Sequence, residues 1–475
     1  AGGGSIPLEA LRLGCEAFAS DLNPVACLIL KVLLEDIPRY GRQKVKVKRQ
    51  NGEEVEVEGL AGALRAVGAE IKRQAERELA ELYPKDPDGS TPIAYLWART
   101  VRCESPNCGA EIPLVRSFWL CKKTNRKFAL RPLRLGGEIA FEIFEPNTEN
   151  DVPAGTVTRA KATCVACGAV LPPERVRAQL AAQRGGADVL FDKRWRRTGG
   201  ARLLAVVTLK PGEQGRHYRL PTEGDYEAVW KAQQRLRALL QAWEQGGRQG
   251  LCPVPDEPTP EGGGSGAGRA FSVQKYGMLR WGDLFTARQK VALVTLSRLV
   301  RELPPSVPEA VRLGMALCVD KTAMQNSSGC RWKPSGESLM DTFGRQALPI
   351  VWDFAESIPI AGSTGDFAVQ ADWLAETINQ QLASLGQAQL ADATEHPLPD
   401  ETAQVWFTDP PYYDAVPYAD LSDFFFVWLK RALPGHPFLR DPFDPENPLV
   451  PKAREAVQNE RSETEDGRPK DKAFY

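Results

Sequence analysis

One tetrapeptide, Asp409-Pro410-Pro411-Tyr412, places a carboxylate, a rigid stretch of backbone and an aromatic ring side by side. It follows Val405–Thr408, an apolar run that predicts a buried strand. The prolines end that strand, so the Asp409 carboxylate and the Pro410 carbonyl are expected at its carboxyl end, where open α/β sheets bind ligands. An exocyclic amine held between two such oxygens donates both hydrogens and keeps its lone pair free for an electrophile, as N-methylation of a base requires. Tyr412 offers a flat face for stacking, a contact of about 1–3 kcal/mol.

Glycines open the sequence in the turn 1–5, ahead of a predicted short helix over Ile6–Leu13. Glycine lets the backbone approach a ligand closely, and the N-terminus of a helix favours an anionic group. Asp21 follows a predicted strand over Glu16–Ser20, and its carboxylate can accept hydrogen bonds from two hydroxyls. Taken singly, each feature is also typical of ordinary structure: a common glycine turn, solvated loop acids at Asp21 and the later Asp392, and a structural turn at the tetrapeptide.

Four of the ten cysteines fall into two close pairs, Cys103 with Cys108 and Cys164 with Cys167. Each pair ends in Cys-Gly-Ala, and a glycine after a ligand lets the backbone turn its N–H groups toward sulfur. Four thiolates suffice for a closed tetrahedral zinc site, which would be structural because no ligand position stays open. The wide first spacing and the long separation of the pairs leave free buried cysteines as the alternative. Cys121 is a candidate substitute ligand. The other cysteines are expected in the core or as incidental thiols: Cys15, Cys27, Cys252, Cys318 and Cys330.

In their order along the chain, these features resemble one family. The tetrapeptide is similar to the catalytic motif of S-adenosylmethionine-dependent amino-methyltransferases that act on the N6 atom of adenine. With the cysteine pairs and the segments Tyr276–Gln289 and Arg345–Glu356, nearly the whole chain resembles the adenine-specific DNA methylases that contain a zinc ribbon. The resemblance implies that adenine is flipped out of the duplex before methyl transfer.

The resemblance also implies a role for each candidate residue. The catalytic residues would be Asp409, Pro410, Pro411 and Tyr412. S-adenosyl-L-methionine would be bound by Ala1, Gly2, Gly4, Asp21 and Asp392. Within that set, Asp21 would accept from the ribose hydroxyls and Asp392 would lie near the adenine amine. A structural Zn²⁺ would be held by Cys103, Cys108, Cys164 and Cys167.

The implied fold is α/β, a Rossmann-like class I methyltransferase sheet that is incomplete and is interrupted by a zinc-ribbon insertion and a helical region. We expect a chain truncated at both ends, because the family's first strand would precede Ala1 and its last strands would follow Tyr475. Weak cofactor binding, or none, is then expected. The expected domains are 1–38, the first part of the core; 39–90, a hairpin and a helix; 91–250, the basic zinc-ribbon and target-recognition insertion; 251–268, a linker; 269–375, the helical region; and 376–475, the second part of the core.

The insertion is the basic part of a chain whose net charge is −1. Residues 91–220 contain 22 Lys and Arg against 11 Asp and Glu, an excess that suits a phosphate polymer. Cations gather around Trp119 and Trp195, where a ring can wedge or stack beside neutralised phosphates. They are Arg116, Lys122, Lys123, Arg126 and Lys127 in the first cluster and Lys193, Arg194, Arg196 and Arg197 in the second. DNA is therefore the expected partner, with solvated basic faces as the alternative. The resemblance adds a defence or restriction-modification protein as a partner.

Other functions fit the same motifs. Cytosine N4 and RNA bases share the amine geometry, and Asp409 rather than serine at the first position of the tetrapeptide favours adenine. A zinc-ribbon DNA-binding protein with a degenerate, non-catalytic methylase fold is the alternative from another class, against which the intact Asp409 and Tyr412 argue.

Length and composition set the class of protein. With 475 residues, 43% hydrophobic and 25% charged, the chain matches a globular protein of several domains. No apolar run reaches the roughly 18 residues that a membrane span needs, so we expect no membrane partner. The absence of a secretory signal and the sparse cysteines predict a cytoplasmic protein.

Periodicity and turn residues predict the remaining elements. Lys44–Glu58 is expected to be a surface hairpin in which Val47 lies opposite Val55. Pro253–Gly268 predicts a flexible linker or disordered loop, and the charged tail from Lys452 is expected to be mobile. The expected helices are Ala61–Leu82, Tyr226–Glu244, Trp281–Leu303, Glu309–Ser327, Phe367–Leu385 and Ala419–Ala432, and the further strands are Phe128–Leu135 and Leu203–Leu209.

Overall fold

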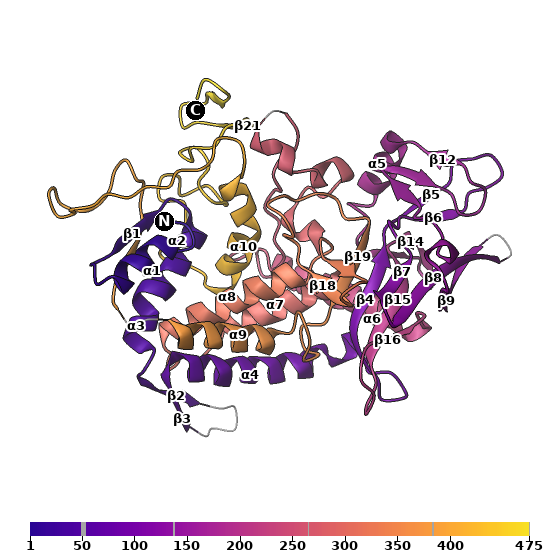
Figure 1. Cartoon of the computed structure of the whole chain (residues 1–475), viewed down its shortest axis with the longest axis horizontal. Coiled ribbons are helices and arrows are strands. Elements are labelled where there is room, and N and C mark those ends of the chain that lie inside the picture. Colours follow the sequence, from indigo (N-terminus) through magenta and orange to yellow (C-terminus); the bar gives the residue numbers. More distant parts are fainter. Residues whose placement is uncertain (49–53, 136–137, 265, 382–383, 475) are drawn as a thin grey trace.

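The computed structural model describes residues 1–475 except 49–53, 136–137, 265, 382–383 and 475. It is a mixed α/β protein with small sheets, in which three regions lie side by side (Figure 1). A region around α1, β1 and α2 forms one end, long helices form the middle, and antiparallel sheets form the other end. Both termini lie toward the first of these ends.

The N-terminal region depends on a parallel pair of strands from opposite ends of the chain. Its elements are α1 (Ser5–Arg12), β1 (Phe18–Asp21), α2 (Pro24–Lys31), a π-helical turn (Val32–Asp36), α3 (Ile37–Tyr40) and β20 (Gln387–Leu390). Phe18 lies opposite Gln387, and Asp21 lies opposite Leu390. The side chain of Asn23 caps α2 by accepting a 3.0 Å hydrogen bond from the N–H of Val25.

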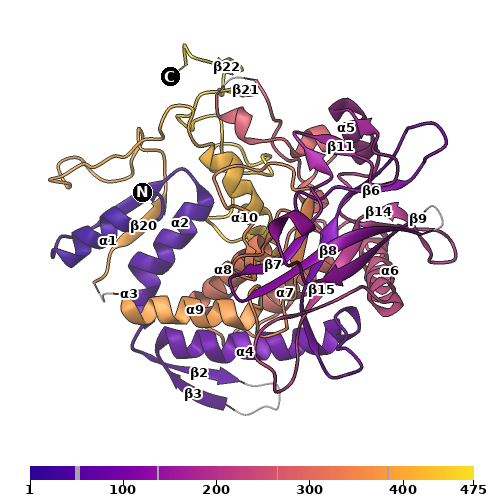
Figure 2. The same ribbon diagram turned by 45° about the vertical axis from the view of Figure 1, so that its right-hand side comes forward.

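Five helices pack against one another in the middle and supply most of the largest hydrophobic core. They are α4 (Gly59–Leu79), α7 (Ala287–Arg301), α8 (Glu309–Gln325), α9 (Phe367–Gln380) and α10 (Tyr418–Ala432). Figure 2 shows α9 lying along α4, with the hairpin of β2 (Lys44–Lys48) and β3 (Glu54–Glu58) below α4. A capping box of Thr286 and Gln289 begins α7, and Asp366 caps α9, so side chains fix where these helices start.

Antiparallel sheets form the far end. The largest has the order β16 (His217–Arg219), β15 (Arg202–Leu209), β4 (Thr91–Ala98), β19 (Asp353–Ser357). A three-stranded sheet contains β7 (Trp119–Lys123), β8 (Arg126–Leu135) and β9 (Glu138–Phe144). Two helices, α5 (Pro173–Ala182) and α6 (Glu223–Gln245), complete this end. The smaller strands are β5 (Thr100–Arg102), β6 (Glu111–Pro113), β10 (Val157–Thr158), β11 (Lys161–Thr163), β12 (Val170–Leu171), β13 (Val189–Phe191), β14 (Arg197–Gly200), β17 (Arg331–Lys333), β18 (Ser338–Met340), β21 (Asn459–Glu463) and β22 (Pro469–Lys470).

A buried ion pair joins the helical middle to the four-stranded sheet. Arg288 on α7 and Glu356 on β19 meet at 2.7 Å, with side chains 1% and 0% exposed. The indole N–H of Trp97 donates to the same carboxylate at 2.7 Å, and the Tyr95 ring centre lies 3.9 Å from the guanidinium carbon. Segments 276–289 and 345–356, which contribute to the family resemblance, therefore meet at this pair, and its role is structural.

Most predicted elements are confirmed to within a few residues. α1, α4, α6, α8 and α10 match the predicted helices, and β8 and β15 match the predicted strands. The hairpin register is confirmed, since Val47 lies opposite Val55 and Lys46 opposite Glu56. The predicted loop over residues 50–52 lies outside the described residues.

Three local predictions are wrong in detail. Val405–Thr408 is not a strand: Val405 is 79% and Phe407 67% exposed. A strand needs a neighbour to pair with, and no described strand pairs with this segment. The helix predicted from Trp281 is split, because the cap at Thr286 begins α7 after a 3₁₀ turn over Trp281–Leu284. The helix predicted to end at Leu385 ends at Gln380.

Two segments predicted to be flexible are anchored by buried charges. Glu257, in the predicted linker, accepts a 3.0 Å hydrogen bond from Arg431 on α10 and is 6% exposed. In the predicted mobile tail, Lys452 pairs with Asp423 at 2.7 Å and Lys470 is 1% exposed. A charged residue need not be solvated, and these charges have partners within the folded protein, so both segments contact its interior.

The doubly wound sheet implied by the resemblance is not seen among the described residues. β1 with β20 is the one parallel pair of strands in the described ranges, and the larger sheets are antiparallel. No helix within the described part of the chain is long and apolar enough to cross a bilayer.

Removing one partner of the buried pair should strongly destabilise the fold. Glu356→Ala leaves the Arg288 guanidinium uncompensated, and we expect the free energy of unfolding to fall by about 3–5 kcal/mol. Glu9→Ala breaks the exposed Arg12–Glu9 pair and should cost less than about 1 kcal/mol. Urea denaturation followed by circular dichroism measures both, and a loss below about 1 kcal/mol for Glu356→Ala would contradict the structural role of the pair.

Candidate functional site

The four paired cysteines converge on one point. The sulfur atoms of Cys103, Cys108, Cys164 and Cys167 all lie within 4.8 Å of one another. Two Sγ–Sγ distances, from Cys103 to Cys167 and from Cys108 to Cys164, are 3.7 Å. A tetrahedron of thiolates about 2.3 Å from a central cation has edges of about 3.8 Å, so this cluster can hold a metal ion.

Two similar hairpins present these cysteines. The N–H of Cys103 donates to the carbonyl of Ala110, and the N–H of Cys164 donates to that of Ala169, both at 2.9 Å. The intervening glycines have φ angles of +59° at Gly109 and +76° at Gly168, where a side chain would be strained. The repeated Cys-Gly-Ala therefore makes the same turn twice, as the sequence predicted.

The surroundings of the cluster shift the pKa values of two of its thiols in opposite directions. Burial raises the pKa of Cys103 to about 12, whereas the N–H of Ala169, with a smaller effect of Cys108, lowers the pKa of the exposed Cys167 to about 7. Cys121, the candidate substitute ligand, lies outside the cluster and donates to the Arg126 carbonyl at 3.2 Å. The donor set is thus the predicted four.

A second group of predicted residues meets at the carboxyl edge of β1 and β20. Asp21 is the last residue of β1, Asp392 follows the adjacent parallel strand β20, and the N–H of Ala391 donates to the Asp21 carbonyl at 3.1 Å. The Asp21 carboxylate accepts from the N–H of Gly2 at 2.7 Å and from the N–H of Asn23 at 2.9 Å. The nitrogen of Ala1 also lies 2.8 Å from the Asp21 carboxylate. The glycine turn and one predicted acid are therefore bonded to each other.

Gly4, in the same turn, is required for the backbone conformation and the packing of the turn. It precedes α1 with φ +85°, and a β-carbon there would lie 3.1 Å from a methyl carbon of Leu30 and 3.2 Å from one of Leu33. Only glycine fits both the backbone angle and the packing of the turn on this segment.

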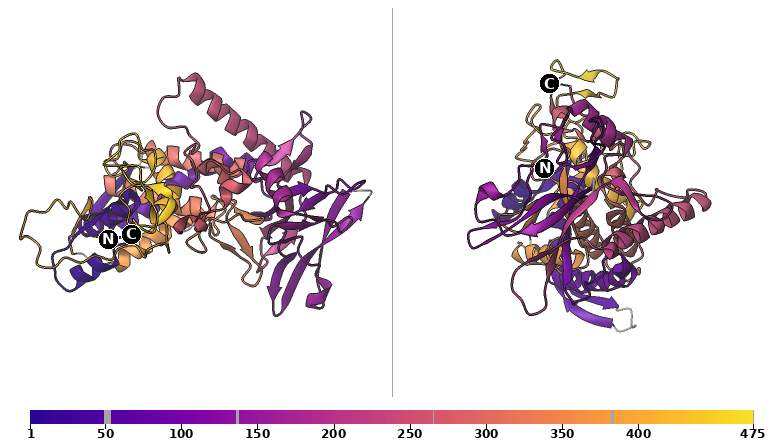
Figure 3. Two further views of the ribbon diagram at one scale, coloured as in Figure 1. Left: turned by 90° about the horizontal axis from the view of Figure 1, so that it is seen from above. Right: turned by 90° about the vertical axis from the view of Figure 1, so that its right-hand side faces the viewer.

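The tetrapeptide lies in an exposed loop. Tyr412 is 62% exposed, and its hydroxyl donates to the exposed Asp409 carboxylate at 3.3 Å. The helix that follows the loop, α10, is tied to the β1 region, because the amide of Asn23 donates to the Ser422 hydroxyl at 2.6 Å. Figures 1 and 3 show the segment between β20 and α10 projecting at the same end of the molecule as α1 and β1.

Sequence reasoning missed Arg454, whose side chain bonds Asp392, one of the predicted cofactor-binding residues. Its guanidinium bonds Asp392 at 3.2 Å, Glu395 at 3.4 Å and Glu465 at 2.5 Å. The guanidinium carbon lies 4.0 Å from the centre of the Phe443 ring. No local pattern marks this arginine, because its partners are dispersed along the chain.

Glu455, next to Arg454, holds the start of α10. Its carboxylate accepts from the N–H of Ala419 at 2.9 Å, and burial raises its pKa to about 7. Further along, the N–H of Gln458 donates to the Tyr413 carbonyl at 3.1 Å. Residues 452–458 therefore contact both the loop that carries the tetrapeptide, at Tyr413, and the start of α10.

The predicted basic cluster around Trp119 is largely neutralised within the protein. Arg116 pairs with Asp353 at 2.7 Å and Lys122 with Glu149 at 2.9 Å. Lys123 and Arg126 share the buried Glu337, at 2.7 and 2.9 Å.

The cluster around Trp195 keeps more of its charge. Arg197 pairs with Glu111 and Arg196 with Asp192, but no ion pair of Lys193 or Arg194 is found in the described part of the chain. Trp195 itself is 44% exposed. Of the two predicted clusters, only this one offers cations beside an exposed ring.

Comparison with protein-family models, with curated proteins and with solved structures gives no match to this chain.

Cys164→Ser should release the bound metal, because three thiolates and a hydroxyl hold a cation much less tightly than four thiolates. Cys121→Ser is the matched control, a buried cysteine outside the cluster. Plasma mass spectrometry should find one metal ion per chain in the parent and in Cys121→Ser and far less in Cys164→Ser. Metal retained by Cys164→Ser at the parental level would contradict the site.

Proposed function

We propose that the chain is an S-adenosylmethionine-dependent DNA methyltransferase that acts on adenine N6. The observation that carries the proposal is the convergence of the glycine turn, Asp21 and Asp392 at the carboxyl ends of two parallel strands. This edge is where open α/β sheets bind ligands, and the hydrogen bonds of Asp21 to this turn link two of the predicted cofactor elements.

The chemistry of these residues fits the cofactor. S-adenosylmethionine, when bound, supplies an electrophilic methyl group on a sulfonium. Asp21, oriented by the N–H groups of Gly2 and Asn23, would accept from the ribose hydroxyls, and Asp392 would accept from the adenine amine. Gly4, buried against Leu30 and Leu33, holds the conformation of the turn at the start of α1, and Gly2 and Gly3 in the same turn are exposed.

The substrate would be held by the exposed tetrapeptide. The Asp409 carboxylate and the Pro410 carbonyl would each accept one hydrogen of the target amine, so that its lone pair is aimed at the methyl group. Tyr412, with its ring exposed, would stack on the flipped base. Transfer would depend mainly on the orientation of the amine toward the methyl group, and no nucleophilic side chain is needed.

The metal in the cysteine cluster is proposed to be a structural zinc ion. Four sulfur donors in two knuckles favour a soft, tetrahedral cation, and four ligands leave no position for substrate. The knuckles of β5–β6 and β11–β12 lie at the end of the molecule remote from β1 (Figures 1 and 2). The ion would therefore stabilise the insertion without taking part in transfer.

Cytosine N4 and an RNA base remain the closest alternatives, since each presents an exocyclic amine of the same kind. A non-catalytic zinc-ribbon protein is the alternative from another class. Mass spectrometry of nucleosides after incubation with duplex DNA or with RNA separates these substrates. The non-catalytic alternative predicts binding without any transfer.

Asp409→Ala should abolish methyl transfer to DNA and leave cofactor affinity unchanged, because the carboxylate contacts only the target amine. The exposed loop acid Asp400 provides the control, and Asp400→Ala should retain parental activity. Transfer is measured as N6-methyladenine formed from isotopically labelled S-adenosylmethionine. Parental activity in Asp409→Ala, or no transfer by the parent to any nucleic acid, would refute the proposal.

Arg454→Ala should strengthen cofactor binding. In the structure the planar guanidinium lies over Phe443 and bonds Asp392, so it competes with an adenine amine for that carboxylate. Release of this partly exposed pair, worth roughly 1 kcal/mol, predicts an affinity about fivefold higher by calorimetry. Arg468→Ala, which breaks an exposed pair with Asp466, is the control. Unchanged or weaker binding in Arg454→Ala would exclude the competition.

A further inference from the structure

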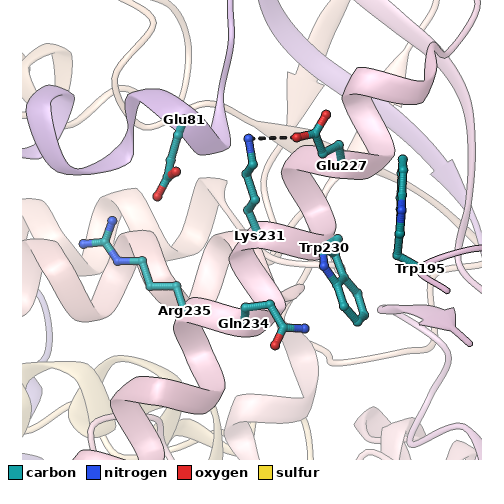
Figure 4. Close-up of a pocket in the computed structure, with 7 residues that line it drawn as sticks. All are labelled: Glu81, Trp195, Glu227, Trp230, Lys231, Gln234 and Arg235. Atoms are coloured by element: carbon teal, nitrogen blue, oxygen red, sulfur yellow. Dashed lines mark ion pairs between the residues drawn. The ribbon is translucent and has the colours of Figure 1, made fainter. Parts of the chain in front are cut away.

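Two tryptophans line a hollow at the end of the molecule remote from β1. The hollow has a volume of about 680 Å³ and is lined by Trp195, Trp230 and polar side chains (Figure 4). Trp230 lies on α6, whose C-terminal part stands away from the body of the protein in both views of Figure 3. None of the residues proposed for methyl transfer lines this hollow.

Trp195 is held outward by a rigid turn. Its φ angle is +52°, a backbone conformation that is costly for a bulky residue. Asp192 fixes the turn: its carboxylate accepts from the N–H groups of Arg194 and Arg196, at 2.8 and 3.0 Å. The carbonyl of Asp192 accepts from the N–H of Trp195 at 3.0 Å. The backbone that carries the exposed indole is therefore fixed before any ligand arrives.

Trp230 is fixed as well. The Phe191 ring packs edge-on against it, with ring centres 5.5 Å apart at 75°. The guanidinium carbon of Arg237 lies 5.8 Å from the centre of the Trp230 ring. Both rings of the hollow thus belong to supported elements, the β13–β14 hairpin and α6.

The polar lining offers donors and acceptors together. Lys231 pairs with Glu227 at 2.9 Å, and Gln234 and Glu81 also line the hollow. Amide, carboxylate and ammonium groups suit the mixed edge of a nucleobase. Lys193 and Arg194, next to Trp195 in the sequence, supply charge for a phosphate backbone.

We propose that this hollow binds an unpaired nucleobase of single-stranded or locally opened DNA, stacked on Trp195 and Trp230. Base stacking on aromatic side chains tolerates any sequence and requires no methyl transfer, so the site goes beyond the proposed function. A quaternary ammonium is the other ligand that two indoles can hold. It is disfavoured because Lys231 already neutralises Glu227 and Arg237 lies over the Trp230 ring.

The test is fluorescence anisotropy of the full chain with a labelled, short single-stranded oligodeoxynucleotide. Trp195→Ala and Trp230→Ala should each weaken binding about 5- to 150-fold, the equivalent of about 1–3 kcal/mol per stacked base. Trp195→Phe, which keeps a flat ring, should restore most of the affinity. Trp373→Ala removes a tryptophan on α9 that is more exposed than Trp195, at 57% against 44%, and should bind as the parent does.

Further measurements distinguish base stacking from attraction by charge alone and from misfolding. Removing the charges of both Lys193 and Arg194 should make binding less dependent on salt. The slope of log K against log salt concentration should become less steep by about 0.7 for each lost phosphate contact. Thermal denaturation checks that each variant is folded. Binding of the oligonucleotide is measured without S-adenosylmethionine, and Asp400→Ala should bind like the parent, so failure of methyl transfer and failure of this site are distinguishable.

Parental affinity in both folded alanine variants would overturn the inference. A loss of affinity in these variants for blunt duplex DNA alone would also overturn it. That result would indicate that the rings insert into a groove of the duplex and do not bind an unpaired base. Binding of tetramethylammonium, measured by quenching of tryptophan fluorescence, without binding of the oligonucleotide would assign the hollow to a cationic ligand instead.

Discussion

The parallel pairing of β1 with β20 is the constraint on which the candidate transfer site depends. Phe18–Asp21 can lie beside Gln387–Leu390 only if the whole intervening chain folds back on itself. This pairing brings Asp21 and Asp392 to one edge, and the hydrogen bond from Asn23 to Ser422 adds α10 to the same region. Because ladder hydrogen bonds fix the register, a shift of one residue would move Asp392 relative to Asp21 and the glycine turn.

Buried charges hold the remaining chain in a shape that permits this pairing. Arg288 and Glu356 connect the helical middle to the four-stranded sheet, and Arg431 with Glu257 connects α10 to the segment before α7. Each charge is costly to bury unless its partner is correctly placed, so these pairs favour one arrangement of the regions over others. The apolar contacts around them, such as the Phe285–Phe424 stack at 5.7 Å, supply the stabilising free energy.

The two ends of the molecule present different surfaces to a nucleic acid. Near β1 the exposed groups are the Asp409 carboxylate and the Tyr412 ring, which suit one base. At the far end Trp195, Lys193 and Arg194 lie on a hairpin that contacts the β5–β6 knuckle, since Arg197 on β14 pairs with Glu111 on β6. The basic excess of the insertion is smaller at the surface than in the sequence, because Glu337 neutralises two of its cations.

The sequence by itself determined features that depend on neighbouring residues. The Cys-Gly-Ala turns, the register of Val47 with Val55 and the amphipathic helices α4 and α6 follow from local spacing, and the structure has them. Only the tertiary structure decided which charges are neutralised and which segments are fixed. Arg454 beside Asp392 and Lys452 beside Asp423 are examples, as is Val405–Thr408, whose apolar pattern predicts a strand that has no described neighbour. The reason is physical: turn and helix preferences act within a few residues, whereas an ion pair or a strand needs a partner that only the folded chain brings near.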